Sequence, residues 1–173
     1  MNRCVVISGC SSGGKSTLLV ELHRQGYPVV KEPGRRVVRA ELAAGGSALP
    51  WVDPIAFLHR ALALARADRA DCGDALTFFD RGTVDAALGL EHLTGVLATS
   101  TLRDCPRYAP LVFLAPPWPE IFVRDDERRH GFDEAATEYE RLLSGFPQLG
   151  YQVAVLPKAA VSTRAEFVLS AIG

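Results

Sequence analysis

Residues 9–16 read Gly-Cys-Ser-Ser-Gly-Gly-Lys-Ser and match the phosphate-binding pattern G-x-x-x-x-G-K-[S/T] at every constrained position. A short β-branched run over residues 4–8 precedes this motif, and an apolar helical pattern over residues 17–22 follows it. Strand, loop and helix therefore occur in the order that a phosphate-binding loop requires. A glycine-rich turn that only joins a strand to a helix is the alternative, and the two matching flanks make it the weaker one. The motif predicts nucleotide binding.

The residue types in this loop explain how it would hold phosphate. Glycines allow backbone conformations closed to other residues, so that successive N–H groups can point at one anion. The first turn of the next helix adds unpaired N–H groups, the Lys15 ammonium can reach the β- and γ-phosphates, and the Ser16 hydroxyl can bind Mg²⁺. The predicted nucleotide-binding residues are Gly9, Ser11, Ser12, Gly13, Gly14, Lys15, Ser16 and Thr17.

Length and charge limit the class of protein. A chain of 173 residues predicts one domain over residues 1–173, with a core that needs no metal or disulfide. The net charge of −1 provides no general attraction to nucleic acid or to anionic lipid. No apolar segment is long enough for a signal peptide or a membrane span, so we expect a cytoplasmic protein that binds neither nucleic acid nor membrane. The sequence does not indicate an oligomeric state.

The four cysteines lack the C-x-x-C spacing of metal or redox motifs. Cys4 and Cys10 occur where a buried strand and a phosphate loop are expected. We therefore expect reduced thiols.

Five short apolar runs alternate with helical patterns along the chain. This alternation predicts an α/β fold with a parallel sheet. The expected strands cover residues 4–8, 29–31, 76–79, 111–115 and 153–156.

Charged residues follow the second and third of these runs. Glu32 and Arg35 come after residues 29–31, and Asp80 and Arg81 after residues 76–79. Because ligands bind beyond the carboxyl ends of parallel strands, these side chains are predicted to lie near the phosphate loop. Asp80 could hold Mg²⁺ through its waters or accept a proton, and Arg81 could bind phosphate oxygens. The alternatives are a solvated helix start for Glu32 and Arg35, and a capping Asp with a surface Arg for the second pair.

Residues 117–132 predict a helical lid, because a densely charged stretch begins at Glu120, directly after Pro-Pro-Trp-Pro. Its basic side chains, Arg128 among them, could close over a polyphosphate and neutralise charge on the transferred group. A solvated helix would have the same composition.

These motifs together resemble the small bacterial P-loop proteins grouped as AAA-type ATPase-like, kinase-related domains, which are similar to the ribosylnicotinamide kinase domain and the deoxynucleoside kinases. The resemblance covers nearly the whole chain. It rests on residues 9–16, Glu32-Pro33-x-Arg35, Phe79-Asp80-Arg81-Gly82, Pro117-Trp118-Pro119 with Asp125-x-Glu127-Arg128, and Leu156-Pro157.

The resemblance implies a three-layer fold whose five-stranded parallel sheet has the order 2-3-1-4-5. It implies that Glu32 is a base or contacts the substrate hydroxyl, that Asp80 is a magnesium-linked or basic carboxylate, and that Arg81 binds phosphate or substrate. Arg128 would be a lid arginine, and Pro157 would border adenine. Asp80 departs from the Glu that deoxynucleoside kinases often carry there, so substrate identity does not transfer.

The sequence therefore predicts a kinase that transfers the γ-phosphoryl group of MgATP to a nucleoside-like or other hydroxyl-bearing metabolite. Its catalytic residues would be Lys15, Glu32, Asp80 and Arg128, its substrate residues Glu32, Arg35 and Arg81, and its metal ligands Ser16 and Asp80. Either Glu32 or Asp80 could be the base. No Asn/Thr-Lys-x-Asp guanine signature is present, which favours ATP over GTP. The alternative is a nucleotide-dependent switch or hydrolase that acts on a protein partner.

Overall fold

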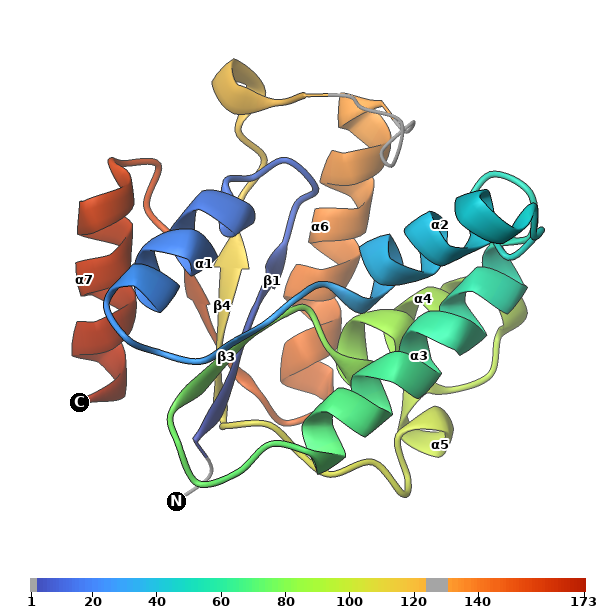
Figure 1. Cartoon of the computed structure of the whole chain (residues 1–173), viewed down its shortest axis with the longest axis horizontal. Helices are drawn as coiled ribbons and strands as arrows, with labels where there is room; N and C mark the ends of the chain where they lie inside the picture. Colours follow the sequence, from blue (N-terminus) through green and yellow to red (C-terminus); the bar gives the residue numbers. More distant parts are fainter. Residues whose placement is uncertain (1–2, 124–130) are drawn as a thin grey trace.

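A parallel sheet forms the middle of the molecule (Figure 1). A computed structural model gives the structure, which describes residues 3–123 and 131–173. The strands lie in the order β2-β3-β1-β4-β5, and each pairing is parallel. The strands are β1 (Cys4–Gly9), β2 (Val29–Val30), β3 (Thr77–Asp80), β4 (Leu111–Ala115) and β5 (Gln152–Val155). The predicted α/β fold and its strand order are confirmed.

Helices cover both faces of this sheet (Figure 1). Helices α1 and α7 pack together on one face, while α4 and α6 cover the other. Helix α3 packs on α4, and α2 packs on α3. The helices are α1 (Lys15–Arg24), α2 (Pro33–Ala44), α3 (Pro54–Ala70), α4 (Thr83–Thr94), α5 (Ala98–Thr101), α6 (Phe132–Gln148) and α7 (Val161–Ile172), with a 3₁₀ turn η1 (Pro119–Ile121).

Alternating side chains of the central strands enter two separate cores. Val6 and Phe79 join the core beneath α4 and α6, whereas Val5, Ile7 and Phe78 join the core beneath α1 and α7. Successive residues of a strand point to opposite faces. Strands that are covered on both sides must therefore be apolar at nearly every position, which explains the continuous apolar runs in the sequence.

Helix α2 positions the residues that follow β2. It begins at Pro33, directly after Glu32, and ends at Ala44, where Gly45, with a φ of 65°, caps it. Proline suits the first helical position because its missing N–H would be unpaired there in any case. Glu32 and Arg35 consequently lie at the start of a helix, on the same sheet edge as the phosphate loop, as predicted.

The cysteine expectation is wrong in part. Cys4, at the start of β1, forms a disulfide with Cys72, in the connection after α3. Cys10 and Cys105 are free thiols. Spacing along the chain gave no sign of this pairing, because the parallel sheet brings residues 68 apart together. Disulfides persist chiefly in oxidising compartments, so the cytoplasmic location stays a prediction.

Residues 124–130 of the predicted lid, Arg128 among them, lie outside the described residues. The described part of residues 117–132 contains η1 and the first residue of α6. Within residues 3–123 and 131–173, no helix combines the length and the apolar composition that crossing a membrane requires.

Candidate functional site

Residues 9–16 form the loop between β1 and α1, and two glycines fix its path. Gly9 has a φ of 108°, and a Cβ there would lie 2.4 Å from backbone atoms of Ala115 in β4. Gly14 has a φ of 81° and caps α1, which begins at Lys15. A positive φ and a close backbone contact both favour glycine. The glycines of the motif therefore let the loop turn tightly over the ends of β1 and β4.

Lys15 is buried beneath this loop. Its Nζ donates a hydrogen bond to the Cys10 carbonyl oxygen at 2.7 Å. Burial lowers the pKa of Lys15, and the nearby Arg81 charge lowers it further, while Asp80 and Glu32 raise it. An incoming anion supplies a countercharge, and so favours the charged form of an ammonium group that burial has separated from water.

Asp80 ends β3, beside Ile7 of β1, and is 7% exposed. Burial and the neighbouring Glu32 raise the pKa of Asp80 to about 7, against the opposing charges of Lys15 and Arg81. Its Oδ1 has no hydrogen-bond partner in the described part of the chain. Asp80 and Ser16 both line a cavity of about 400 Å³ between α1 and α2, which we call the outer cavity. An unpartnered carboxylate oxygen near a hydroxyl suits a hard cation, so these two residues fit the predicted Mg²⁺ site.

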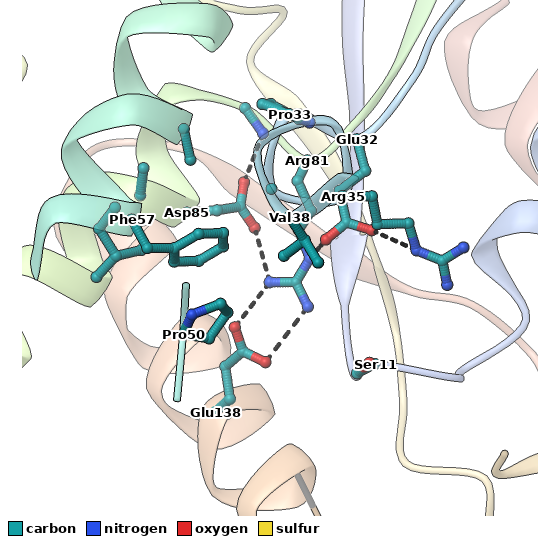
Figure 2. A pocket seen from close by; sticks show the side chains of 15 residues that line it. Ser11, Glu32, Pro33, Arg35, Val38, Pro50, Phe57, Arg81, Asp85 and Glu138 are labelled. Carbon is teal, nitrogen blue, oxygen red and sulfur yellow. Dashed lines mark hydrogen bonds and ion pairs between the residues drawn. The ribbon is translucent and has the colours of Figure 1, made fainter. Parts of the chain in front are cut away.

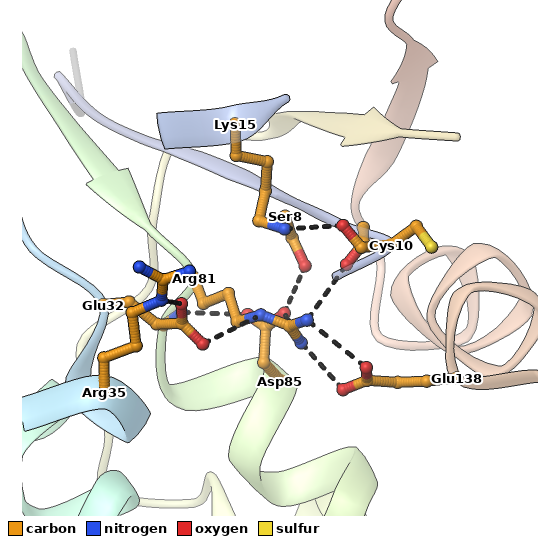
Figure 3. Close-up of polar contacts among 10 residues, drawn as sticks. Ser8, Cys10, Lys15, Glu32, Arg35, Arg81, Asp85 and Glu138 are labelled. Atoms are coloured by element: carbon orange, nitrogen blue, oxygen red, sulfur yellow. Dashed lines mark hydrogen bonds and ion pairs between the residues drawn. The ribbon is translucent and has the colours of Figure 1, made fainter. Parts of the chain in front are cut away.

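Arg81 lies among three carboxylates (Figure 3). Its Nη1 and Nη2 donate to Glu138 Oε1 and Oε2 at 2.8 and 3.3 Å, and Nη2 also donates to the Gly9 carbonyl oxygen at 3.1 Å. Nε lies 3.5 Å from Glu32 Oε1, and Nη1 lies 3.7 Å from Asp85 Oδ1. One guanidinium thus joins the phosphate loop to α2, α4 and α6.

The pKa values of two of these carboxyls shift in opposite directions. Burial alone would raise the pKa of Glu138, but the charge and hydrogen bonds of Arg81 outweigh burial and hold it below its usual range. For Asp85 burial dominates and raises the pKa, although Arg81, the Ser8 hydroxyl and the Gly82 N–H favour the ionised form. Glu138 is therefore a fixed negative charge beside the site.

A cavity of about 190 Å³, the helical cavity, lies between α2, α3 and α4 (Figure 2). Its apolar side is formed by Val38, Pro50, Phe57, Leu58, Ala61 and Ala86. Its polar side is formed by Ser11, Glu32, Arg35, Arg81, Asp85 and Glu138. An apolar pocket with a few convergent polar groups is the usual form of a small-molecule site.

A second cavity of about 450 Å³, the loop cavity, lies above the phosphate loop and α1. Lys15 and Ser16 of α1 line it, and so do Trp118, directly before η1, and Arg164 of α7. Arg164, on α7, donates from Nη1 to the Gly14 carbonyl oxygen at 2.8 Å, and its guanidinium carbon lies 5.6 Å from the centre of the Trp118 ring. The loop cavity and the helical cavity share Ser11, Glu32, Arg35 and Arg81.

Comparison with known families decides the class of protein. A family model described as an AAA domain matches residues 4–164. The chain belongs to this AAA-domain family. The resemblance to AAA-type P-loop proteins is thereby confirmed. A search of curated proteins finds no match.

Solved structures share the fold of this AAA domain at low sequence identity. Deoxyadenosine kinase from M. mycoides is 15% identical, with a TM-score of 0.68 over 98% of this chain and 97% of its own. Thymidylate kinase from Ehrlichia chaffeensis is 13% identical, with a TM-score of 0.66 over 98% and 97%. NadR, in a complex with NR, is 20% identical, with a TM-score of 0.67 over 99% of this chain and 50% of its own.

The AAA domain brings most of the predicted site residues together. Glu32 and Arg35 line all three cavities, and Arg35 Nε lies 3.3 Å from Glu32 Oε2. Arg81 faces the helical and loop cavities, as the prediction of a substrate ligand requires, but it is paired with carboxylates. Pro157 is the second residue after the end of β5 and does not line the loop cavity as far as the chain is described. The roles of these residues stay predictions.

Sequence reasoning missed Glu138 and Arg164. Glu138 lies on α6 three residues after buried Ala135 and four before buried Leu142. Arg164 similarly precedes buried Ala165 and Val168 on α7. A charged residue on the apolar face of an amphipathic helix was the available signal, since burying an unpaired charge is unfavourable and such a residue must find a partner.

Proposed function

We propose that this AAA domain is a small-molecule kinase that transfers the γ-phosphoryl group of ATP to a hydroxyl of a small acceptor. The observation that carries the proposal is the junction of two cavities. The loop cavity and the helical cavity share Ser11, Glu32, Arg35 and Arg81, so a ligand in one lies beside a ligand in the other. Two substrates held side by side are what group transfer needs.

In this proposal the loop cavity binds the donor. The loop N–H groups and the start of α1 hold the phosphates, and Lys15 exchanges its hydrogen bond to the Cys10 carbonyl for phosphate oxygens. Trp118 and Arg164, which pack on each other, offer a flat surface in this cavity, where the base can pack. The missing guanine signature supports ATP as the donor.

Ser16 and Asp80 would hold Mg²⁺, which when bound neutralises charge on the β- and γ-phosphates. Asp80 must lose its proton to act as a ligand, and its pKa of about 7 makes that step possible near neutral pH. Of the three cavities, Asp80 lines the outer one, together with Ser16, whereas Glu32 lines the outer cavity and also both substrate cavities. This difference supports Asp80 as the metal-side carboxylate.

The helical cavity would bind the acceptor, with its hydroxyl beside Glu32. Glu32 accepts the hydroxyl proton, the hydroxyl oxygen bonds to the γ-phosphorus, and the bond from that phosphorus to the β–γ bridging oxygen breaks. Arg81 keeps Glu32 and Glu138 in place. Most of the rate increase would come from positioning and charge neutralisation. Arg128 stays a predicted lid residue outside the described part of the chain.

Similar folds support the class of reaction. Structures described as deoxyadenosine kinase and thymidylate kinase match nearly the whole of this chain. A switch that acts on a protein partner would need the loop cavity only, whereas the helical cavity gives a kinase its second site.

The test is acceptor-dependent release of ADP from ATP and Mg²⁺, measured across nucleosides, vitamins and sugars. The proposal expects at least one acceptor to raise ADP release far above the rate with water alone, together with a phosphorylated product detected by mass spectrometry. Lys15→Ala is the control for a contaminating kinase. ADP release that no acceptor raises would favour the switch.

A further inference from the structure

The charges around the helical cavity are already paired. The described residues that line it include two guanidinium groups, of Arg35 and Arg81, and three carboxylates, of Glu32, Asp85 and Glu138. Arg81 contacts all three carboxylates, and Arg35 contacts Glu32. Neither guanidinium faces the cavity without an acidic neighbour (Figure 2).

The lining of the helical cavity has no net positive charge in either protonation state of Asp85. With Asp85 protonated, two carboxylates match two guanidinium groups. With Asp85 ionised, the lining carries one negative charge in excess. An anionic acceptor would therefore meet a neutral or negative surface, while its own hydration shell is lost on entry.

The apolar side of the cavity limits the size and shape of the acceptor. Phe57, Leu58, Val38 and Pro50 surround a volume of about 190 Å³. A cavity of roughly 150 Å³ holds benzene in an engineered apolar core, so there is room for one ring and its substituents. The Phe57 ring offers a flat partner for an aromatic ring.

We propose that the acceptor is a neutral or positively charged alcohol built on one flat ring, and that phosphate- or carboxylate-bearing acceptors are excluded. The inference rests on the proposed kinase function. The ring packs against Phe57, the hydroxyl reaches Glu32, and guanidinium groups that are already paired with carboxylates do not compensate a second anion beside the donor phosphates.

Calorimetric titration tests this inference without relying on turnover. The probes are thymidine, pyridoxine and a pyridinium riboside, each compared with its own 5′-monophosphate, in the presence of Mg²⁺ and a non-hydrolysable ATP analogue. We expect at least one uncharged or cationic probe to bind at least about tenfold more tightly than its monophosphate, because like-charge contacts oppose the latter. Equal or tighter binding of the monophosphates would overturn the inference, and so would failure of all six probes to bind.

A variant pair identifies the cause of the discrimination. Glu138→Gln keeps the shape of the side chain and removes one negative charge. The ratio of the affinity for the uncharged or cationic probe to that for its monophosphate should therefore fall by roughly threefold or more. Glu140→Gln removes an exposed charge from the same helix and should leave the preference unchanged. An unchanged preference in Glu138→Gln would show that the carboxylates do not set it, which would overturn the charge argument.

Titration of the ATP analogue alone separates this inference from the function on which it rests. If the analogue does not bind, the kinase proposal fails. If it binds, and an anionic acceptor is phosphorylated, the kinase proposal stands and the acceptor class proposed here is wrong.

Discussion

Arg81 and Glu138 are 57 residues apart in the sequence and share two hydrogen bonds, from Nη1 to Oε1 at 2.8 Å and from Nη2 to Oε2 at 3.3 Å. The same guanidinium donates to the Gly9 carbonyl oxygen at 3.1 Å. The end of β3, the first residue of the phosphate loop and the middle of α6 are therefore held by one side chain. Charge-assisted, two-bond contacts of this kind are among the stronger hydrogen bonds in proteins.

Replacing Arg81 by Met should destabilise the protein by about 3–5 kcal/mol, because it leaves Glu138, Glu32 and Asp85 without their shared cation. Without that cation the pKa values of Glu138 and Asp85 should rise in the folded variant, so its stability should fall as pH increases. Urea denaturation at pH 5 and pH 8 measures both effects. Arg103→Ala, at an exposed position, is the control. A deficit that does not grow between the two pH values would contradict the electrostatic explanation.

Lys15→Ala should abolish tight nucleotide binding while the protein stays folded. A hydrogen bond to a charged group contributes about 1.5–3 kcal/mol, which corresponds to a loss of tenfold to a hundredfold or more in affinity. Because burial lowers the pKa of Lys15, its removal also relieves a desolvated charge, and the melting temperature should not drop much. Titration with an ATP analogue and a thermal melt test the two statements. Wild-type affinity in the variant would rule out the phosphate-loop assignment.

Asp80 should make stability depend on pH. Its pKa rises from the usual 3.8 to about 7 in the folded protein, so between these values the folded state holds a proton that the unfolded chain releases. This contribution to stability is complete below the lower value and is lost as pH rises through the upper one. The wild-type protein should therefore lose up to about 4 kcal/mol of unfolding free energy between pH 4 and pH 8 through this group, and Asp80→Asn should not show this loss. Urea denaturation of the wild type and the variant measures this difference. If the stability of both proteins depended on pH in the same way, the prediction would be refuted.

The same carboxyl should control metal binding. Protons compete with Mg²⁺ for Asp80 below pH 7, so the apparent Mg²⁺ affinity of the nucleotide complex should fall by up to about tenfold per pH unit in that range. Mg²⁺ titrations at pH 6 and pH 8 measure this change. Asp80→Asn should bind Mg²⁺ weakly at both pH values, and a strong metal response in that variant would place the site elsewhere.

Arg164→Ala should weaken nucleotide binding by roughly tenfold, since Arg164 bonds the carbonyl oxygens of Gly14 and Ala159 and packs on Trp118. Fluorescence of Trp118 in a Trp51→Phe background reports binding directly. Arg107→Ala is a matched control, because Arg107 also packs on an aromatic ring, that of Tyr151 at 4.4 Å, and donates to a carbonyl oxygen. An equal effect of both substitutions would indicate a general loss of stability.

Gly34→Ala should raise the KM for the acceptor severalfold and leave nucleotide affinity unchanged. A Cβ at Gly34 would lie 3.1 Å from Cζ of Phe57 and would move that ring within the helical cavity. Gly73→Ala introduces the same methyl group where nothing lies within 4 Å, and it should behave as wild type. Unchanged acceptor kinetics in Gly34→Ala would show that the acceptor binds elsewhere.

The parts of the fold that sequence predicted are those encoded locally. The phosphate loop is defined by the spacing of Gly9, Gly14 and Lys15, and the strands by apolar runs that fill both cores. Even β2, only two residues long, was predicted to within one residue, because Glu32 and Pro33 follow the short apolar run. Short-range chemistry is sufficient for such elements.

The rest of the site depends on distant contacts. Arg164 meets Gly14 across 150 residues, and Glu138 meets Arg81 across 57. The Cys4–Cys72 disulfide likewise depends on where two separate segments meet. The apolar faces of α6 and α7 reveal which charged residues need a partner, but only the packed structure identifies that partner.

Asp80 and Arg81 are neighbours in the chain and yet border different cavities. Arg81 has a φ of 62°, which turns the backbone at this point, so Asp80 lines the outer cavity while Arg81 lines the two substrate cavities. In the proposed mechanism, metal binding and acceptor choice are thus separated by a single peptide bond. Engineering a new acceptor preference should therefore change side chains on α2, α3 or α6 and preserve the length of this dipeptide, because one inserted residue would displace both functions together.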